Sequence, residues 1–121
     1  MAKIMIVDDS AYARRVHRAI LERAGHVVVE AATGTSAIES FSLDHPDAVL
    51  LDLSMEDIGG LDVLRTLREL DPAARVIVVS ADVQRSTEQA ALTGGAQRFL
   101  AKPAGADQLV AAVTQVLALV Q

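Results

Sequence analysis

The sequence predicts one α/β domain spanning residues 1–121, built as a doubly wound, five-stranded parallel sheet with five helices. Short apolar runs alternate with amphipathic segments five times, which implies parallel strands joined by right-handed helical crossovers. The runs do not alternate with polar residues, as expected of strands covered by helices on both faces. Connections are a few residues long except after Asp52, and the length fits a single domain.

The first half of the chain predicts three strands and two helices. Residues 4–7 form the first strand, and a helix follows whose apolar positions recur from Ala13 to Ala24, with Gly25 as its C-terminal stop. Residues 27–29 form the second strand, followed by a short helix over residues 35–41. The third strand, residues 48–51, ends at Asp52.

The second half repeats the pattern twice. A leucine stripe from Leu61 to Leu70 predicts a helix that ends before Pro72, and residues 76–79 form the fourth strand. A short helix over residues 85–92 is closed by two glycines. The fifth strand, within residues 96–101, has the weakest β pattern, and the last helix has apolar positions from Leu109 to Val120.

Composition excludes several classes of function. The chain has 11 Lys and Arg residues against 16 Asp and Glu residues, a net charge of −5, whereas a nucleic-acid surface needs a basic footprint. It has no cysteine, which excludes disulfides, thiolate zinc sites and a Cys nucleophile. We find neither a membrane-spanning stretch nor a signal peptide. We therefore expect a cytoplasmic protein that binds neither membrane nor nucleic acid directly.

Polar residues end the apolar runs, at the sheet edge where open parallel sheets bind ligands. Asp9 or Ser10 could instead cap the following helix. Ser80 could simply begin a loop, and Lys102 could be a surface charge. Asp52 has no nearby helix to cap, because the next one begins near Gly60. The strand-end residues are Asp8, Asp9 and Ser10 after the first strand, Asp52 after the third, Ser80 after the fourth and Lys102 after the fifth.

The three carboxylates predict a cation site. If the first and third strands are neighbours, Asp8, Asp9 and Asp52 converge, and they repel unless one is protonated or a cation intervenes. A few carboxylates completed by water suit Mg²⁺ better than Ca²⁺. A carboxylate beside Mg²⁺, with a lysine and a hydroxyl opposite, has the groups that phosphoryl transfer needs.

With these residues in place, the chain resembles the receiver domains of two-component response regulators along nearly its whole length. The resemblance implies the strand order 2-1-3-4-5 of the flavodoxin-like fold. The matching motifs are Val7-Asp8-Asp9-Ser10 with Arg14, Leu21 and Gly25; Gly34 and Ala37; Pro46 to Asp52, followed by Met55 and Gly60; Ser80-Ala81; Gly95-Ala96; and Phe99 to Pro103.

The resemblance also implies a role for each site residue. Asp52 would accept the phosphoryl group and also bind Mg²⁺, for which Mn²⁺ could substitute. Asp9 would bind the ion directly, Asp8 through water, and Ser54 through its backbone carbonyl. Ser80 and Lys102 would each bind a phosphoryl oxygen, and the Lys102–Pro103 peptide bond would be cis. Such a protein is a phosphoacceptor and not an enzyme, because it catalyses only its own phosphorylation and dephosphorylation.

The same resemblance implies how the signal is passed on. Ser80 would move toward the phosphoryl group, and Phe99, where the family usually has an aromatic residue, would follow by packing alone. The expected partners are a sensor histidine kinase or a histidine phosphotransfer protein, and a downstream protein on the face of the fourth helix, fifth strand and last helix. Ala112 and Leu119 lie off the main apolar stripe of the last helix, so this helix could also carry a weak homodimer contact.

Some residues depart from the family or have no assigned role. Glu56 replaces the usual Pro, which predicts a less stiff loop, and with Asp57 it adds negative charge near the site. Ala104 replaces a bulkier residue, which puts packing beneath the last helix in question. The three histidines, 17, 26 and 45, are expected at the surface or at helix ends. Four arginines at positions 14, 15, 18 and 23 predict a solvated helix face, with a partner surface as the alternative.

Two other functions compete with the phosphorylated switch. A magnesium-dependent phosphatase of the haloacid-dehalogenase type also uses an Asp nucleophile, a hydroxyl and a lysine on an α/β sheet. Such enzymes carry Asp-x-Asp after the first strand, whereas Asp8 and Asp9 are adjacent here and the central carboxylate, Asp52, follows the third strand. An unphosphorylated receiver used only for docking is the second alternative, against which the complete set of site residues argues.

Overall fold

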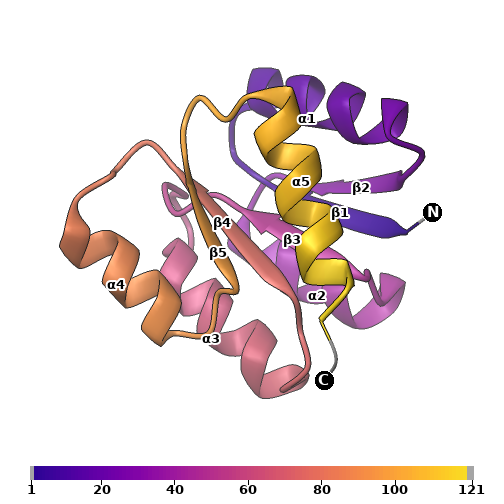
Figure 1. The fold of residues 1–121 in the computed structure, drawn as a ribbon. Coiled ribbons are helices and arrows are strands. Elements are labelled where there is room, and N and C mark those ends of the chain that lie inside the picture. Colours follow the sequence, from indigo (N-terminus) through magenta and orange to yellow (C-terminus); the bar gives the residue numbers. More distant parts are fainter. Residues whose placement is uncertain (1, 120–121) are drawn as a thin grey trace.

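A computed structural model of the chain describes residues 2–119. Within them, five parallel strands form one sheet in the order β2-β1-β3-β4-β5, which confirms the predicted topology (Figure 1). The elements are β1 (Lys3–Val7), α1 (Ala11–Arg23), β2 (Val27–Ala31), α2 (Gly34–Asp44), β3 (Ala48–Leu51), α3 (Gly60–Leu70), β4 (Val76–Ser80), α4 (Arg85–Thr93), β5 (Arg98–Ala101) and α5 (Ala106–Leu117).

Helices cover both faces of the sheet. Helices α1 and α5 lie on one face, and α2, α3 and α4 lie on the other (Figure 1). Side chains alternate between the faces along each strand, so in β1 Ile4 and Ile6 pack under α1 and α5, whereas Met5 and Val7 pack under the other three helices. Both faces of β1, β3 and β4 are therefore buried, and this is why their apolar runs are continuous.

Local signals set the helix ends. Ser10 caps α1, because its hydroxyl accepts a hydrogen bond from the Ala13 amide at 3.1 Å. Helix α2 begins with a capping box and continues to Asp44, beyond the predicted end at residue 41. Its last turn is largely exposed, so it lacks the apolar periodicity that marked the rest of the helix. Helix α5 ends at Leu117, and the predicted contribution of Val120 lies outside the described residues.

The prediction that Ala112 lies off the apolar stripe of α5 is wrong. Ala112 is 4% exposed and belongs to the core beneath α1 and α5, because the stripe that faces the sheet is wider than the spacing of its large side chains indicates. Leu119 is exposed, as expected. Ala104 packs against the same core from the loop before α5. No helix among residues 2–119 combines the length and the apolar character of a membrane span.

Candidate functional site

The carboxyl ends of β1 and β3 bring three carboxylates together. The two strands pair with Val7 opposite Leu51, so the residues that follow them, Asp8 and Asp52, end at the same sheet edge. Carboxylate oxygens of Asp8, Asp9 and Asp52 all lie within 4.8 Å of one another. Asp8 and Asp52 are buried whereas Asp9 is exposed. An all-oxygen cluster that is open on one side fits a hard cation such as Mg²⁺, which keeps several of its waters.

Lys102 lies across this cluster from the end of β5. Its Nζ donates to Asp8 Oδ2 at 2.8 Å and lies 3.3 Å from Asp52 Oδ1. Its backbone amide donates to the Ser80 carbonyl at 2.8 Å, which ties the loop after β5 to β4, and the Lys102–Pro103 peptide bond is cis as expected. Burial works against the ammonium, but its hydrogen bond to Asp8 and the two carboxylate charges outweigh this and raise the pKa of Lys102.

The surroundings of Asp52 disfavour the ionised form of its carboxyl. Burial raises the pKa of its carboxyl, and the neighbouring Asp8 charge raises it further. Lys102 and a hydrogen bond from the Ser54 backbone act in the opposite direction but do not cancel the shift. Asp52 is therefore a buried carboxylate whose negative charge is only partly compensated, which is the electrostatic state expected of a group that binds a cation or reacts with an electrophile.

Ser80 ends β4 beside a cleft that opens at the same edge of the sheet. Its side chain is fully buried, and its Oγ accepts a hydrogen bond from the Asp82 amide at 3.0 Å, which leaves its hydroxyl proton free for an acceptor. The cleft has a volume of about 390 Å³ and is lined by the loop after β3, the start of α3, the end of β4 and the start of α4, including Ser54, Ser80 and Thr87. On β5, Phe99 pairs with Val78 and packs half-buried against the core beneath α2, α3 and α4.

The loop from β3 to α3 is anchored in a way that the sequence did not predict. Asp57 was expected to add charge near the site, but its carboxylate accepts hydrogen bonds from the Gly34 and Thr35 amides at 2.9 and 3.0 Å and from the Thr35 hydroxyl at 2.9 Å. These amides begin α2, so Asp57 supplies negative charge to a helix N-terminus, and the bonds lower the pKa of its carboxyl strongly. The two partners are 22 and 23 residues away, and no local motif signals their pairing.

Close backbone packing holds the same loop. A Cβ placed on Gly60 would lie 2.4 Å from the Leu53 Cα and 2.7 Å from the Asp52 carbonyl oxygen. A Cβ on Gly34 would lie 2.8 Å from the Cβ of Ile58. The loop that carries Ser54 is therefore fixed at both ends by contacts that leave no room for a side chain.

His17 is buried, which corrects the expectation that it lies at the surface or at a helix end. It faces a cavity of about 530 Å³ between α1 and the loop after β5, which Tyr12, Val16 and Lys102 also line. Burial lowers the pKa of its imidazole; the Asp8 carboxylate opposes this shift and the Lys102 ammonium adds to it. Its spacing of four residues from Ala13 and from Leu21 places it on the buried face of α1, a signal present in the sequence. His45 ends α2, as expected.

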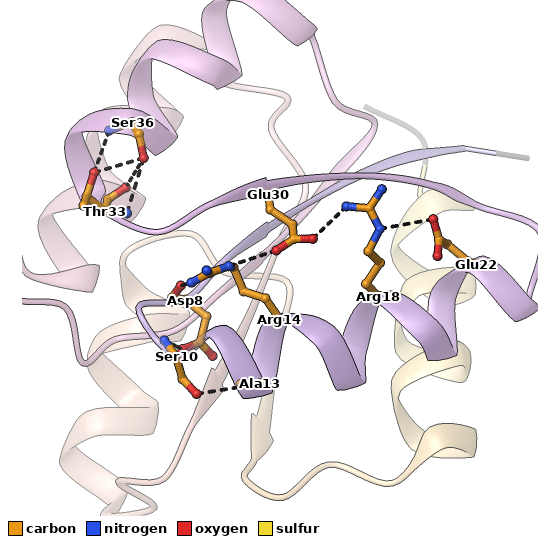
Figure 2. A network of polar contacts seen from close by, with 9 residues as sticks. All are labelled: Asp8, Ser10, Ala13, Arg14, Arg18, Glu22, Glu30, Thr33 and Ser36. Carbon is orange, nitrogen blue, oxygen red and sulfur yellow. Dashed lines mark hydrogen bonds and ion pairs between the residues drawn. The ribbon is translucent and has the colours of Figure 1, made fainter.

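The arginines of α1 are not all solvated. Arg14 and Arg18 both form ion pairs with Glu30 on β2, and Arg18 also pairs with Glu22 (Figure 2). Arg15 and Arg23 are exposed, as predicted for this face.

Comparison with known proteins adds an independent line of evidence. Residues 4–114 match the model of the response regulator receiver domain family. The chain is 36% identical to the chemotaxis protein CheY of Bacillus subtilis (strain 168), an alignment that covers 95% of this chain and 97% of that protein. It is 34% identical to CheY of Thermotoga maritima, with 94% and 96% covered. A crystal structure of a two-component response regulator of the LuxR family from Aurantimonas sp. SI85-9A1 superposes with a TM-score of 0.92 at 32% identity, covering 98% of this chain and 86% of that one.

Proposed function

The chain belongs to the family of response regulator receiver domains, the phosphorylation-activated switches of two-component signalling, and on that premise we propose that Asp52 is its phosphoacceptor. The observation that carries the proposal is the position of Asp52, which is buried beside two further carboxylates and within 3.3 Å of the Lys102 ammonium. We assign residues 1–121 to one receiver domain, of which the family match covers residues 4–114.

The haloacid-dehalogenase-type phosphatase is not supported. The family match spans most of the chain, and the catalytic carboxylate of such phosphatases would follow the first strand, whereas Asp52 follows β3. The chain is a signalling protein of the receiver type.

In the proposed reaction, a carboxylate oxygen of Asp52 attacks the phosphorus of a donor phosphohistidine. An acyl phosphate forms, the phosphorus–nitrogen bond breaks, and the released imidazole nitrogen takes up a proton from solvent. Asp8, Asp9 and the backbone carbonyl of Ser54 would hold Mg²⁺ or Mn²⁺ together with Asp52. When bound, the ion supplies positive charge that offsets the charge of the phosphoryl oxygens.

Lys102 and Ser80 serve the phosphoryl group in this proposal. The Lys102 ammonium forms ion pairs with Asp8 and Asp52 in the unphosphorylated protein. Once Asp52 carries a dianion, one phosphoryl oxygen offers this ammonium a charge-assisted hydrogen bond, and the Ser80 hydroxyl donates to another. The same arrangement would admit a water molecule that hydrolyses the acyl phosphate, so the domain also dephosphorylates itself.

The donor would bind at the exposed N-terminal part of α1. A receiver domain implies a sensor histidine kinase or a histidine phosphotransfer protein as its partner. Tyr12 is 71% exposed and, with Val16, lines the cavity that reaches Lys102. An apolar surface next to the acceptor suits the approach of a donor helix that carries the phosphohistidine.

The signal would leave the site through β4 and β5. We propose that Ser80 moves toward the phosphorylated Asp52 and that Phe99, which pairs with β4, repacks in response. The changed surface is the face of α4, β5 and α5, where a downstream protein or a second copy of the chain would bind. Phosphorylation then shifts the populations of two existing conformations.

Intact-mass measurement tests the phosphoacceptor. Incubation with Mg²⁺ and acetyl phosphate should add the mass of one phosphoryl group to the wild type. Asp52→Asn should remain unchanged, and so should the wild type in excess EDTA. An equal mass gain in Asp52→Asn would exclude this residue as the acceptor.

A nuclear magnetic resonance comparison tests the switch. Addition of Mg²⁺ and fluoroberyllate, which mimics the phosphoryl group, should shift the Phe99 ring signals and the amides of α4 and α5. Ser80→Ala should still accept a phosphoryl group but lose most of the distant shifts. Shifts confined to the loops around Asp8 and Asp52 would refute the proposed path.

A further inference from the structure

Arg14 joins α1, β2 and the loop that carries two of the three clustered carboxylates (Figure 2). We propose that Arg14, held by Glu30, is a positioning residue that keeps Asp8 and Asp9 in the orientation that cation binding requires. This inference rests on the proposed function, since it concerns the same Mg²⁺ site.

The contacts of Arg14 are short and directed at the backbone of that loop. Its Nη1 donates to the Asp8 carbonyl oxygen at 2.7 Å, and its Nε donates to Glu30 Oε1 at 2.9 Å. The Arg14 side chain is only 18% exposed, so solvent competes little for these bonds. The Asp8 carbonyl belongs to the peptide that links Asp8 to Asp9, and fixing it fixes the plane from which both side chains project.

Other contacts restrain the same loop at different atoms. The Ser10 amide donates to Asp8 Oδ1 at 2.9 Å, and the Asp8 amide donates to the Ala31 carbonyl at 3.1 Å. Neither contact reaches the peptide between Asp8 and Asp9. The charge-assisted bond from Arg14 does, and it opposes the rotation by which repelling carboxylates would move apart. Groups that hydrogen-bond behind a metal ligand set its orientation and hence its affinity for the ion.

Glu30 is shared by two arginines, which gives the proposal an internal control. Arg18 Nη1 lies 2.7 Å from Glu30 Oε2, and Arg18 Nε lies 3.2 Å from Glu22 Oε2. Within the part of the chain that the structure describes, Arg18 makes no hydrogen bond to the loop of Asp8 and Asp9. Both arginines therefore lie on α1 and pair with Glu30, but only Arg14 also holds the Asp8 carbonyl.

Mg²⁺ titration by calorimetry, with wild type, Arg14→Gln, Arg18→Gln and Asp9→Asn, tests the inference. Arg14→Gln should weaken Mg²⁺ binding about tenfold, as is typical when a group behind a metal ligand is removed. Arg18→Gln should bind Mg²⁺ like the wild type. In the absence of Mg²⁺, the amide signals of Asp9 and Ser10 should shift in Arg14→Gln and not in Arg18→Gln. If Arg14→Gln does not fold, Glu30→Gln takes its place, and its loss of affinity should exceed that of Arg18→Gln.

Each outcome decides one question. Equal Mg²⁺ affinities in Arg14→Gln and Arg18→Gln, with Asp9→Asn impaired, would overturn the role of Arg14 and leave the proposed site intact. Unchanged Mg²⁺ binding in Asp9→Asn would overturn the proposed site itself. Equal losses in both arginine variants would show that the ion pairs with Glu30, and not the bond to Asp8, control affinity.

Discussion

Asp52→Asn should stabilise the fold when Mg²⁺ is absent. Burial and the Asp8 charge raise the pKa of Asp52, so at neutral pH the folded protein holds this carboxylate in a less favourable environment than the unfolded chain does. A neutral amide of similar shape removes that cost. The gain should shrink as the pH falls from 7 toward the ordinary carboxyl pKa of about 4, because the wild-type carboxyl then becomes neutral in the folded state as well.

The size of the effect follows from the geometry. At an effective dielectric constant of about 20, two carboxylates at the outer limit of 4.8 Å repel by about 3.5 kcal/mol, and the ammonium 3.3 Å from Asp52 attracts it by about 5 kcal/mol. Asp9 adds a smaller, solvent-screened repulsion, so the Coulomb contributions nearly cancel. What remains is the cost of removing a carboxylate that is 4% exposed from water, which exceeds the corresponding cost for an amide. We expect a net gain of about 1–2 kcal/mol, or about 4 °C in melting temperature for each kcal/mol in a domain of this length.

Urea unfolding in EDTA, followed by circular dichroism, measures this gain. Glu39→Gln is the matched control, because Glu39 is exposed on α2, and it should change the free energy of unfolding by less than about 0.5 kcal/mol. A lower stability for Asp52→Asn would refute the reasoning, since it would mean that the attraction of Lys102 outweighs repulsion and burial together.

Three further predictions concern the surroundings of the site. Asp57→Ala should lower the urea midpoint, because the amides at the start of α2 lose their acceptor, whereas Glu56→Gln next to it should leave the midpoint unchanged. Gly60→Ala should lower the free energy of unfolding by about 1–3 kcal/mol, because the new Cβ meets backbone atoms. Gly105→Ala is the control: no atom lies within 4 Å of its added Cβ, so its stability in thermal melts should change little. His17→Leu should remove a pH dependence of stability. Burial lowers the pKa of His17, so the unfolded chain binds the proton first and wild-type stability falls as the pH drops below about 6.5. Thermal melts across that pH range should show this fall in the wild type and not in the variant.

Much of the fold and of the site could be predicted because the determining signals are local. The apolar runs of β1, β3 and β4 identify strands buried on both faces, and the polar residues that end them necessarily meet at one sheet edge. The convergence of Asp8, Asp9 and Asp52 requires in addition that β1 and β3 are neighbours, an order that the resemblance to receiver domains implied and the sheet confirms. The roles of these residues, of Ser54, Ser80 and Lys102, and of Phe99 remain predictions.

The remainder depends on distant contacts. Asp57 caps a helix that begins 23 residues earlier, and Arg14 on α1 pairs with Glu30 on β2, 16 residues later, so neither pairing follows from local spacing. The helical spacing of His17 signals its burial, but a histidine does not by itself mark an apolar stripe. Ala112 contributes little to an apolar pattern, so its burial became evident only from packing.

Locating the phosphoryl group tests the central claim most directly. The protein is incubated with Mg²⁺ and acetyl phosphate, the acyl phosphate is reduced with borohydride, and the digested peptides are sequenced by mass spectrometry. Reduction converts a phosphorylated aspartate to homoserine, so we predict homoserine at position 52 and unmodified aspartate at positions 8 and 9. Homoserine at Asp8 or Asp9, or a modified peptide from elsewhere with Asp52 intact, would contradict the account.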